Sequence, residues 1–348
     1  MRNILGVERE ELAGWLVERG EKAYRADQVL GWAYGRSVEQ WGGMTNVSAA
    51  LRSRLGAVFS LRQSEVVKVQ EGADGTRKYL LRWLDGSTTE TVLIRRGGRA
   101  TVCVSSQVGC PVRCAFCASG LGGLERSLSA GEIVEQVMRV REGLAAEAGK
   151  GQALRVSHVV IMGMGEPLAN YDEVLRAVRI LNASWGLGIA ARHITVSTVG
   201  LPDKIRRLAT EPVQVTLAVS LHAGSDELRR RLVPWAERIT LEEIFEAIAD
   251  YFRATHREVT LEYVLLDGVN SGQQDAEALA QWARRGRCNV NVINYNAVSE
   301  TGYRPVDGAT LRSFCRRLEE RGVNVHVRAS VGGKIDAGCG QLRRRAAE

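Results

Sequence analysis

The sequence has little of several residue types and patterns that would assign a protein to a class at once. Its 348 residues include only six prolines and 6% aromatic residues, and no run approaches the roughly eighteen apolar residues of a membrane span. The N-terminus becomes charged before a signal-peptide core can form. With 45% apolar and 25% charged residues, the composition is that of a globular protein rather than a collagen-like, low-complexity or disordered one. We expect a cytoplasmic protein that does not associate with membranes.

Cysteine is also scarce, with seven residues in the whole chain. That number is too low for a disulfide scaffold and is odd, so the cysteines cannot all be paired within one molecule. In the reducing cytoplasm we expect thiols. Cys103, Cys110, Cys114 and Cys117 lie close together in the sequence, whereas the other three are scattered. Such clustering in a reduced protein indicates a metal or cluster site.

The charge balance is modestly basic, with 47 Lys and Arg against 40 Asp and Glu, a net charge of +7. This excess is compatible with a polyanionic partner, but also with ordinary solvated helix faces. The basic residues gather at 95–99, 229–231, 316–317 and 343–345.

Hydrophobic periodicity divides the chain into parts. Residues 1–60 carry apolar residues at helical spacing in three segments, the last capped by Asn46, which predicts a helical accessory domain. Residues 61–98 contain three short β-type runs separated by Asp-Gly dipeptides at 74–75 and 85–86. Asp-Gly is a strong hairpin signal, so this part predicts a small antiparallel meander.

From residue 99 to 300, β-rich runs alternate with amphipathic segments, so the fold class is α/β. Six β/α units in series predict a parallel sheet, either open or curled into a barrel, with its chemistry at the carboxyl ends of the strands. Residues 301–348 add a helix, a strand and a mobile tail, whose glycines surround Cys339 and allow the backbone to move. The expected strands are 100–105, 158–162, 193–197, 213–220, 259–265 and 289–294, and the expected helices are 130–148, 172–182, 202–210, 241–255 and 275–284.

Cys110, Cys114 and Cys117 form a C-x3-C-x2-C pattern directly after the first strand of the β/α series. Three thiolates from one loop can hold three corners of a [4Fe-4S] cube, for which full coordination takes four cysteines. The fourth iron would then be open to a substrate or cofactor, as in catalytic zinc sites. A zinc knuckle is the alternative, although no fourth Cys or His follows at zinc-finger spacing.

Polar residues follow several other strands. A Met-Gly-Met-Gly-Glu-Pro-Leu segment ends the second one, and its glycines allow a ligand to approach the backbone closely. Each polar residue has an ordinary structural explanation, but together they indicate one shared site. The set comprises Gly165, Glu166, Ser197, Ser220, Leu221, His222 and Asn296.

Two resemblances follow from these motifs. The cysteine pattern, with Phe116 before its last cysteine, resembles the signature of radical S-adenosylmethionine (SAM) enzymes. The segments at 102–110 and 335–342, with the Gly-Glu-Pro-Leu and Ser-Leu-His motifs, resemble the RlmN/Cfr family of radical SAM RNA adenosine methyltransferases over essentially the whole chain. This implies a radical SAM partial (β/α)6 barrel with a helical, RNA-binding accessory domain and a small β extension. It also implies a [4Fe-4S] cluster on the three clustered cysteines and two SAM molecules per turnover, bound by the polar set above.

The resemblance assigns roles to three further residues. Because adenine C2 and C8 carry no acidic proton, the family routes the methyl group through a protein thiol. Cys339 is implied to accept the methyl as a thioether and later to carry the RNA adduct, and Cys103 to resolve that adduct through a transient disulfide with Cys339. Glu90 matches a family glutamate that accepts a proton or contacts the adenine. Cys288 and Cys315 are expected to be inert.

The family has an RlmN branch that modifies C2 and a Cfr branch that modifies C8. Pro167 and Val108 are similar to the RlmN branch, so we expect C2 methylation of an adenosine in 23S rRNA, at the peptidyl transferase centre, and of an adenosine next to the tRNA anticodon. The expected enzyme is a monomer with a flavodoxin- or ferredoxin-type electron donor. The alternatives are C8 methylation, and a metal- or cluster-containing RNA-binding module without methylation. Departures at 295–297 and 338 leave the tRNA substrate open.

An RNA substrate would explain the excess of Lys and Arg over Asp and Glu, because structured RNA is held largely through its phosphates. We expect Arg95, Arg96, Arg99 and the terminal arginines to make these contacts.

Overall fold

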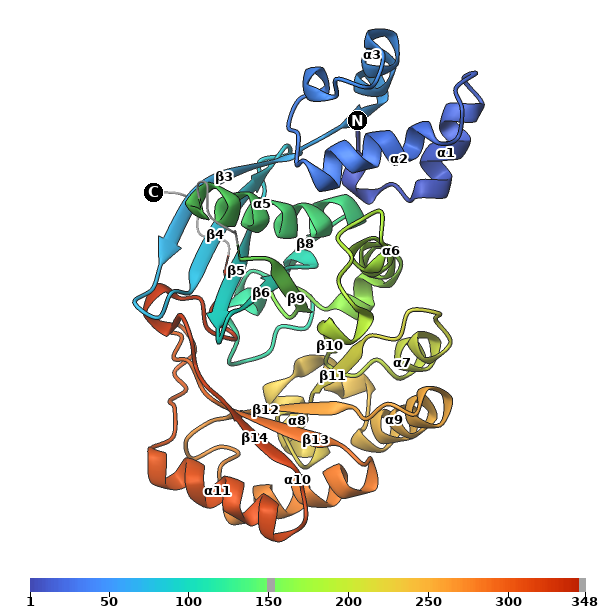
Figure 1. Cartoon of the computed structure of the whole chain (residues 1–348). Helices are drawn as coiled ribbons and strands as arrows, with labels where there is room; N and C mark the ends of the chain where they lie inside the picture. Colours follow the sequence, from blue (N-terminus) through green and yellow to red (C-terminus); the bar gives the residue numbers. More distant parts are fainter. Residues whose placement is uncertain (149–153, 344–348) are drawn as a thin grey trace.

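One mixed sheet of ten strands runs through the protein in this computed structural model, which describes residues 1–148 and 154–343 (Figure 1). The strand order is β14-β13-β12-β11-β10-β9-β6-β5-β4-β3. Pairing is parallel from β6 to β14 and antiparallel from β3 to β6. The meander and the β/α series therefore share one sheet. The strands are β3 Ser64–Glu71, β4 Arg77–Trp83, β5 Thr88–Arg96, β6 Arg99–Val104, β9 Val156–Ile161, β10 Ile194–Thr198, β11 Thr216–Ser220, β12 Thr260–Leu265, β13 Asn289–Asn294 and β14 Val325–Arg328.

Burial along the strands explains why the parallel and antiparallel parts read so differently in the sequence. β12 is buried from its second residue to its last, as expected for a parallel strand inside a curled sheet covered by helices. β3, at the free edge of the meander, has no fully buried residue. The expected radical SAM α/β fold is confirmed, and the parallel part continues past the sixth strand into β14.

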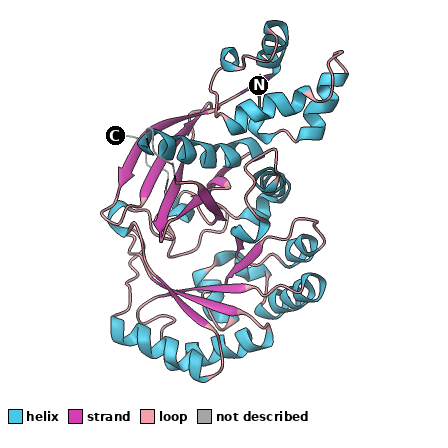
Figure 2. Cartoon of the chain, viewed as in Figure 1, coloured by secondary structure: helices cyan, strands magenta, loops and turns pink. Residues whose placement is uncertain are grey.

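Helices cover the outer face of the parallel strands (Figures 1 and 2). The expected helices are confirmed to within about two residues, but the short helix α8 was missed. The helix α9 shows why the periodic signal worked: Thr240 and Glu243 form a capping box at its start, and His256 ends it with φ 56°. The helices are α5 Ala130–Ala148, α6 Tyr171–Asn182, α7 Pro202–Ala209, α8 Asp226–Leu232, α9 Leu241–Thr255, α10 Gln273–Arg285 and α11 Gly308–Glu320.

The N-terminal head contains α1 Arg9–Val17, α2 Arg25–Leu30 and α3 Ala49–Val58. The cap expected at Asn46 was wrong: the oxygen of Ser48 caps α3 by accepting from the amide of Leu51 at 3.3 Å. The side-chain amide of Asn3 donates to Glu135 of α5 at 2.7 Å, which fastens the head to the barrel.

A small ribbon, β7 Gln107–Gly109 and β8 Leu124–Ser127, brackets the cysteine loop and the four-residue helix α4 Ala118–Leu121. The amide of Cys110 donates to the carbonyl of Gly123 at 3.1 Å, so the two ends of the loop are held together. At the other end of the chain, residues 336–343 lie against β4, β5 and β6. Among the described residues, no helix has the length and apolarity of a membrane span.

Candidate active site

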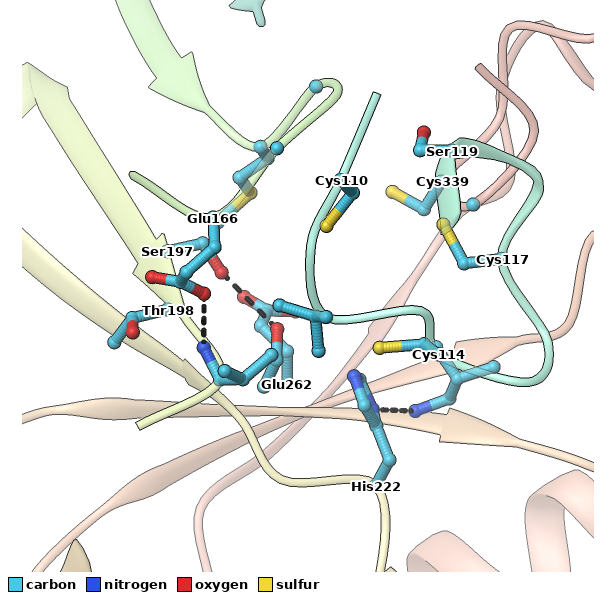
Figure 3. Close-up of a pocket in the computed structure, with 18 of the residues that line it drawn as sticks. Cys110, Cys114, Cys117, Ser119, Glu166, Ser197, Thr198, His222, Glu262 and Cys339 are labelled. Atoms are coloured by element: carbon cyan, nitrogen blue, oxygen red, sulfur yellow. Dashed lines mark hydrogen bonds between the residues drawn. The ribbon is translucent and has the colours of Figure 1, made fainter. Parts of the chain in front are cut away.

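The three clustered cysteines face one cavity at the carboxyl ends of the parallel strands, called here the cysteine cavity. Figure 3 shows their sulfur atoms turned toward the same space, across from Glu166 and Ser197. The loop backbone is tightly held, because the amide of Ala115 donates to Leu232 at 2.9 Å. Burial raises the pKa of all three thiols, to about 12 for Cys110. Without a bound cation these groups are therefore neutral thiols.

The Gly-Glu-Pro-Leu turn forms the wall opposite the cysteines. Gly165 adopts φ 110°, and a Cβ there would lie 2.6 Å from the hydroxyl oxygen of Ser106, so only glycine fits. Glu166 is buried and accepts hydrogen bonds from the amides of Val199 at 2.8 Å and Leu168 at 2.9 Å. Burial nevertheless raises the pKa of Glu166 to about 7.

The next two strand ends contribute Ser197 and Ser220, whose hydroxyl oxygens lie 3.3 Å apart on neighbouring strands. His222 follows in the left-handed region with φ 60°, and its Nδ1 accepts from the amide of Val264 at 3.1 Å. Burial, with a smaller contribution from Arg229, lowers the pKa of His222 to about 3. The ring is therefore neutral and carries its proton on Nε2. Unlike these residues, Leu221 is fully buried and does not line the cavity.

Arg229 of α8 is a buried cation beside the cysteine loop. It is 1% exposed and donates through Nη2 to the carbonyl of Val199. Its Nε and Nη1 atoms are buried without a hydrogen-bond partner in the described parts of the chain. Burial lowers its pKa to about 10, and the neighbouring Cys114 opposes that shift. Two unsatisfied donors on a buried cation are costly unless an anionic group is bound nearby.

A second and larger cavity, called here the barrel cavity, has a volume of about 650 Å³ and lies against the inner face of the partial barrel. It reaches from Cys103 on β6 and Cys339 on the tail down to the amino ends of β9 and β10. The described residues that line it include three arginines and two histidines but no carboxylate. The arginines are Arg96, Arg99 and Arg328, and the histidines are His158 and His193. His158 and His193 stack with ring centroids 4.2 Å apart.

Cys339 lies where the two cavities meet, since it lines both of them. Its thiol is open to these cavities but surrounded by protein, and burial raises its pKa, with Glu262 adding to the effect. Burial likewise raises the pKa of Cys103 to about 12. Both are free thiols in this structure, so the disulfide that the resemblance implied is not formed in this state.

The tail around Cys339 is hydrogen-bonded to its surroundings, whereas its glycines suggested mobility. The side-chain amide of Asn296 donates to the carbonyl of Cys339 at 3.2 Å. The amide of Ala118 donates to Gly340 at 2.8 Å, and the hydroxyl of Ser119 donates to Leu342 at 2.6 Å. Asn296 therefore holds the tail in this conformation.

Glu90 lines neither cavity. It is 4% exposed, and its Oε1 lies 2.8 Å from the Nζ of Lys78. Its Oε2 accepts from the amide of Arg343 at 2.8 Å. The expected catalytic carboxylate is thus covered by the tail.

The expected RNA-contacting arginines occupy different environments. Arg96 and Arg99 line the barrel cavity, whereas Arg95 forms an ion pair with Glu147. Arg343 is paired with Glu300 and Asp336. The last two terminal arginines, at 344 and 345, lie outside the described residues.

Comparisons with known proteins agree with this arrangement. Residues 104–283 match the model of the radical SAM superfamily, which defines the class of protein. Residues 2–61 match the N-terminal domain of ribosomal RNA large subunit methyltransferases. A crystal structure of a radical SAM methyltransferase from Sphaerobacter thermophilus superposes with a TM-score of 0.93 at 42% identity, covering 99% of both chains.

Two relatives are each named probable dual-specificity RNA methyltransferase RlmN. The one from Rhodopirellula baltica is 44% identical over 99% of this chain and 92% of its own length, and the one from Dictyoglomus turgidum is 44% identical over 99% and 97%. The chain therefore belongs to the RlmN family of radical SAM RNA methyltransferases. This membership confirms the resemblance and overturns the alternative of an RNA-binding module without methylation.

Radical SAM enzymes use a [4Fe-4S] cluster and SAM, and the RlmN family uses two SAM molecules per turnover. The described residues include no group of three His, Cys, Asp or Glu arranged around a single ion. A cube, however, attaches each thiolate to a different iron, so its ligands stand farther apart than those of one ion. The three thiols fit such a group because they face one cavity beside the unsatisfied cation Arg229.

Sequence reasoning missed several residues of the site. Glu262 lines the cysteine cavity, is 6% exposed and accepts from the side-chain amide of Asn291 at 2.8 Å. The sequence could have indicated this residue, because a carboxylate inside an otherwise apolar strand is unusual unless it has a function. Lys78 and Arg229 gave no comparable signal, because nothing in the local sequence marks them as buried.

Proposed function

We propose that this protein methylates C2 of an adenosine in 23S rRNA, at the peptidyl transferase centre, and of an adenosine next to the anticodon of tRNA. The position of Cys339 carries the proposal, since this thiol, which lies outside the C-x3-C-x2-C loop, lines both the cysteine cavity and the barrel cavity, as Cys117 of the loop also does. A thiol so placed can meet a cofactor on one side and a nucleobase on the other. Pro167 and Val108 favour C2 over the C8 chemistry of the Cfr branch.

In the cysteine cavity, Cys110, Cys114 and Cys117 would hold the cluster. The residues proposed to bind SAM are Gly165, Glu166, Ser197, Ser220 and His222 on the wall of this cavity, Leu221 behind the wall, and Asn296 on the wall of the neighbouring barrel cavity. When bound, the cluster and SAM supply a methyl group and, by one-electron cleavage of a second SAM, a radical that can remove hydrogen from a methyl group. Water is limited there because His222 and Glu166 are buried.

In the barrel cavity, Cys339 would first lose its proton and accept the methyl group as a thioether. Once this methyl carbon has lost a hydrogen atom to the radical, it would add to the adenine ring, which links the RNA to Cys339, and the adduct would then lose one electron, for which the cluster would be the acceptor, together with the proton of the ring carbon. Cys103, on the wall of the same cavity, would lose its own proton and attack the sulfur of Cys339, which forms a disulfide and breaks the carbon–sulfur bond, and the released carbon would take up a proton to become the methyl group of the base. Glu90 would accept the proton that the adenine carbon loses.

The cations of the barrel cavity support RNA as the substrate. A base taken out of its stack brings its phosphates to the edge of the pocket. Arg96, Arg99 and Arg328 line this pocket, and none of the other lining residues within 1–148 and 154–343 is a carboxylate. They are therefore proposed to bind the phosphates that flank the target adenosine.

The proposal also includes the setting of the enzyme, its electron donor and its domain organisation. The enzyme acts in the cytoplasm, as a monomer, without a membrane, and receives electrons from a flavodoxin- or ferredoxin-type donor. Residues 1–60 form an accessory RNA-binding domain, residues 61–98 a β extension, residues 99–300 the barrel and residues 301–348 the segment that carries Cys339.

The test is an anaerobic assay with reconstituted enzyme, a chemical reductant, methyl-labelled SAM and either an rRNA fragment or tRNA. Digestion of the RNA to nucleosides should give labelled 2-methyladenosine from both substrates. Label in 8-methyladenosine would instead identify Cfr-type chemistry. Label in the rRNA fragment alone would remove tRNA from the proposal.

A further inference from the structure

The meander places three side chains on the face of the sheet that the tail covers. Lys78 on β4 pairs with Val92 on β5, and Val92 pairs with Cys103 on β6. Glu90 lies two residues from Val92, and side chains two apart on a strand share a face. Lys78, Glu90 and Cys103 therefore all face the tail.

Lys78 joins Glu90 to this tail. Its Nζ lies 2.8 Å from Oε1 of Glu90 and donates a second hydrogen bond to the carbonyl of Asp336 at 3.1 Å. The lysine and glutamate side chains are only 6% and 5% exposed. Asp336 precedes Cys339 by three residues, so one ammonium group contacts both the carboxylate and the segment that carries the methyl-accepting thiol.

The two oxygens of Glu90 have different partners. Oε1 is bound by Lys78, which belongs to the sheet, whereas Oε2 is bound by the amide of Arg343, which belongs to the tail. If the tail moved toward a bound RNA, Oε2 would lose its donor while Oε1 kept Lys78. With the tail in place, Oε2 is covered and accepts from the amide of Arg343.

The charges around Glu90 set its protonation state. Burial raises the pKa of Glu90, while Lys78 and, less strongly, the amide of Arg343 lower it, and Asp336 raises it again. Once the tail has moved, Lys78 is the group left to oppose the desolvation of the carboxylate. A buried carboxylate without a cation takes up a proton instead of staying ionised.

We propose that Lys78 is a positioning residue, which keeps Glu90 ionised and directed at the substrate after the tail has released this carboxylate. The tail, by occupying Oε2, reserves the carboxylate for the RNA-modifying half of the reaction. The inference rests on the proposed function. It separates the two half-reactions: methylation of Cys339 proceeds with Glu90 covered, and proton acceptance requires that Glu90 be free.

The experiment compares Lys78→Gln with Lys78→Arg, and with Arg82→Gln as a control that removes an exposed charge from the same strand. Glutamine keeps a hydrogen-bond donor but no charge, so the fold is preserved. Each variant is incubated with SAM, and methylation of Cys339 is read by mass spectrometry. Single-turnover RNA methylation is then measured from pH 6 to pH 9.

We expect Lys78→Gln to methylate Cys339 as the parent does. Its RNA methylation should be about tenfold slower or more at pH 7, with the rise of the rate shifted to higher pH by about one unit or more, because a nearby cation lowers a carboxylate pKa by about that amount. Lys78→Arg should restore most of the rate, and Arg82→Gln should match the parent.

An unchanged pH profile in Lys78→Gln would overturn the inference, and so would loss of Cys339 methylation, which would mean a merely structural role. Failure of the proposed function looks different, since the parent enzyme itself would then leave RNA unmodified at every pH.

Discussion

Replacing Arg229 by methionine tests the assignment of the cluster to this cavity without an activity assay. The guanidinium is fully buried, donates to the carbonyl of Val199 and leaves Nε and Nη1 unsatisfied. Methionine fills a similar volume without charge. We expect the substitution to act in opposite directions on the cluster-free and the cluster-bound protein.

The magnitudes follow from counting these groups. Each unsatisfied buried donor costs about 1–3 kcal/mol, so removing two of them relieves about 2–6 kcal/mol in the cluster-free state. Leaving the carbonyl of Val199 without its donor costs about 1–3 kcal/mol. The central values leave a net gain of about 2 kcal/mol, so we expect the cluster-free variant to be more stable than the parent. In the cluster-bound state, truncating one partner of a buried charge pair costs about 3–5 kcal/mol.

The assay is anaerobic urea unfolding of parent and variant, each with and without reconstituted cluster, with iron content measured in parallel. We expect the gain in unfolding free energy on reconstitution to fall by about 3 kcal/mol or more. Arg229→Lys should keep part of that gain, and Arg230→Met, on the exposed side of the same helix, should keep all of it. Equal destabilisation of both states of Arg229→Met would refute the reasoning.

Three other predictions follow from the two cavities. Arg99→Glu should weaken RNA binding and reduce the slope of log Kd against log salt by about 0.7–0.9 per lost phosphate contact. Arg316→Glu, on the outer helix α11, is the control and should leave the slope unchanged. Equal slopes in the two variants would exclude the barrel cavity as the RNA site. Cys339→Ala should abolish RNA methylation while its iron content stays unchanged. Cys103→Ala should accumulate a protein–RNA adduct, which a denaturing gel detects. Free methylated RNA from either variant would contradict the role assigned to that cysteine. Burial raises the pKa of Glu262 above its unfolded value, so the folding stability that this residue contributes is lost as pH rises through its folded pKa. Cluster-free Glu262→Gln should therefore unfold at a higher temperature than the parent at pH 8 and at a similar temperature at pH 5. An unchanged unfolding temperature at pH 8 would count against a buried, charged glutamate.

Part of the fold and site could be predicted because the signals are local. The turn at Gly165 must be glycine at φ 110°, and the capping box at Thr240 begins a helix wherever the chain goes afterwards. A parallel sheet also brings the carboxyl ends of its strands to one edge. Ser197 and His222 were therefore expected together without any knowledge of their distance, and the cysteine cavity does contain both.

Other features depend on contacts between distant segments, which no local pattern encodes. The pairing of β5 with β6 joins the meander to the barrel, and α8 has only seven residues, too few for a clear periodic signal. Lys78 contacts a carbonyl 258 residues away, and its sequence neighbours give no reason to expect a buried lysine.

The order of residues along the chain sets which chemical groups this protein carries: three clustered thiols, a glycine-rich turn, polar strand ends and a cysteine near the C-terminus. Packing between distant segments sets which of these groups face the same space and in what electrostatic state. The tail brings Cys339 to the boundary of two cavities, covers Glu90 and leaves Lys78 buried beside it. The physical reason is that burial and charge pairing depend on every segment packed around a group, whereas helices, turns and strand order depend mainly on the residues nearby.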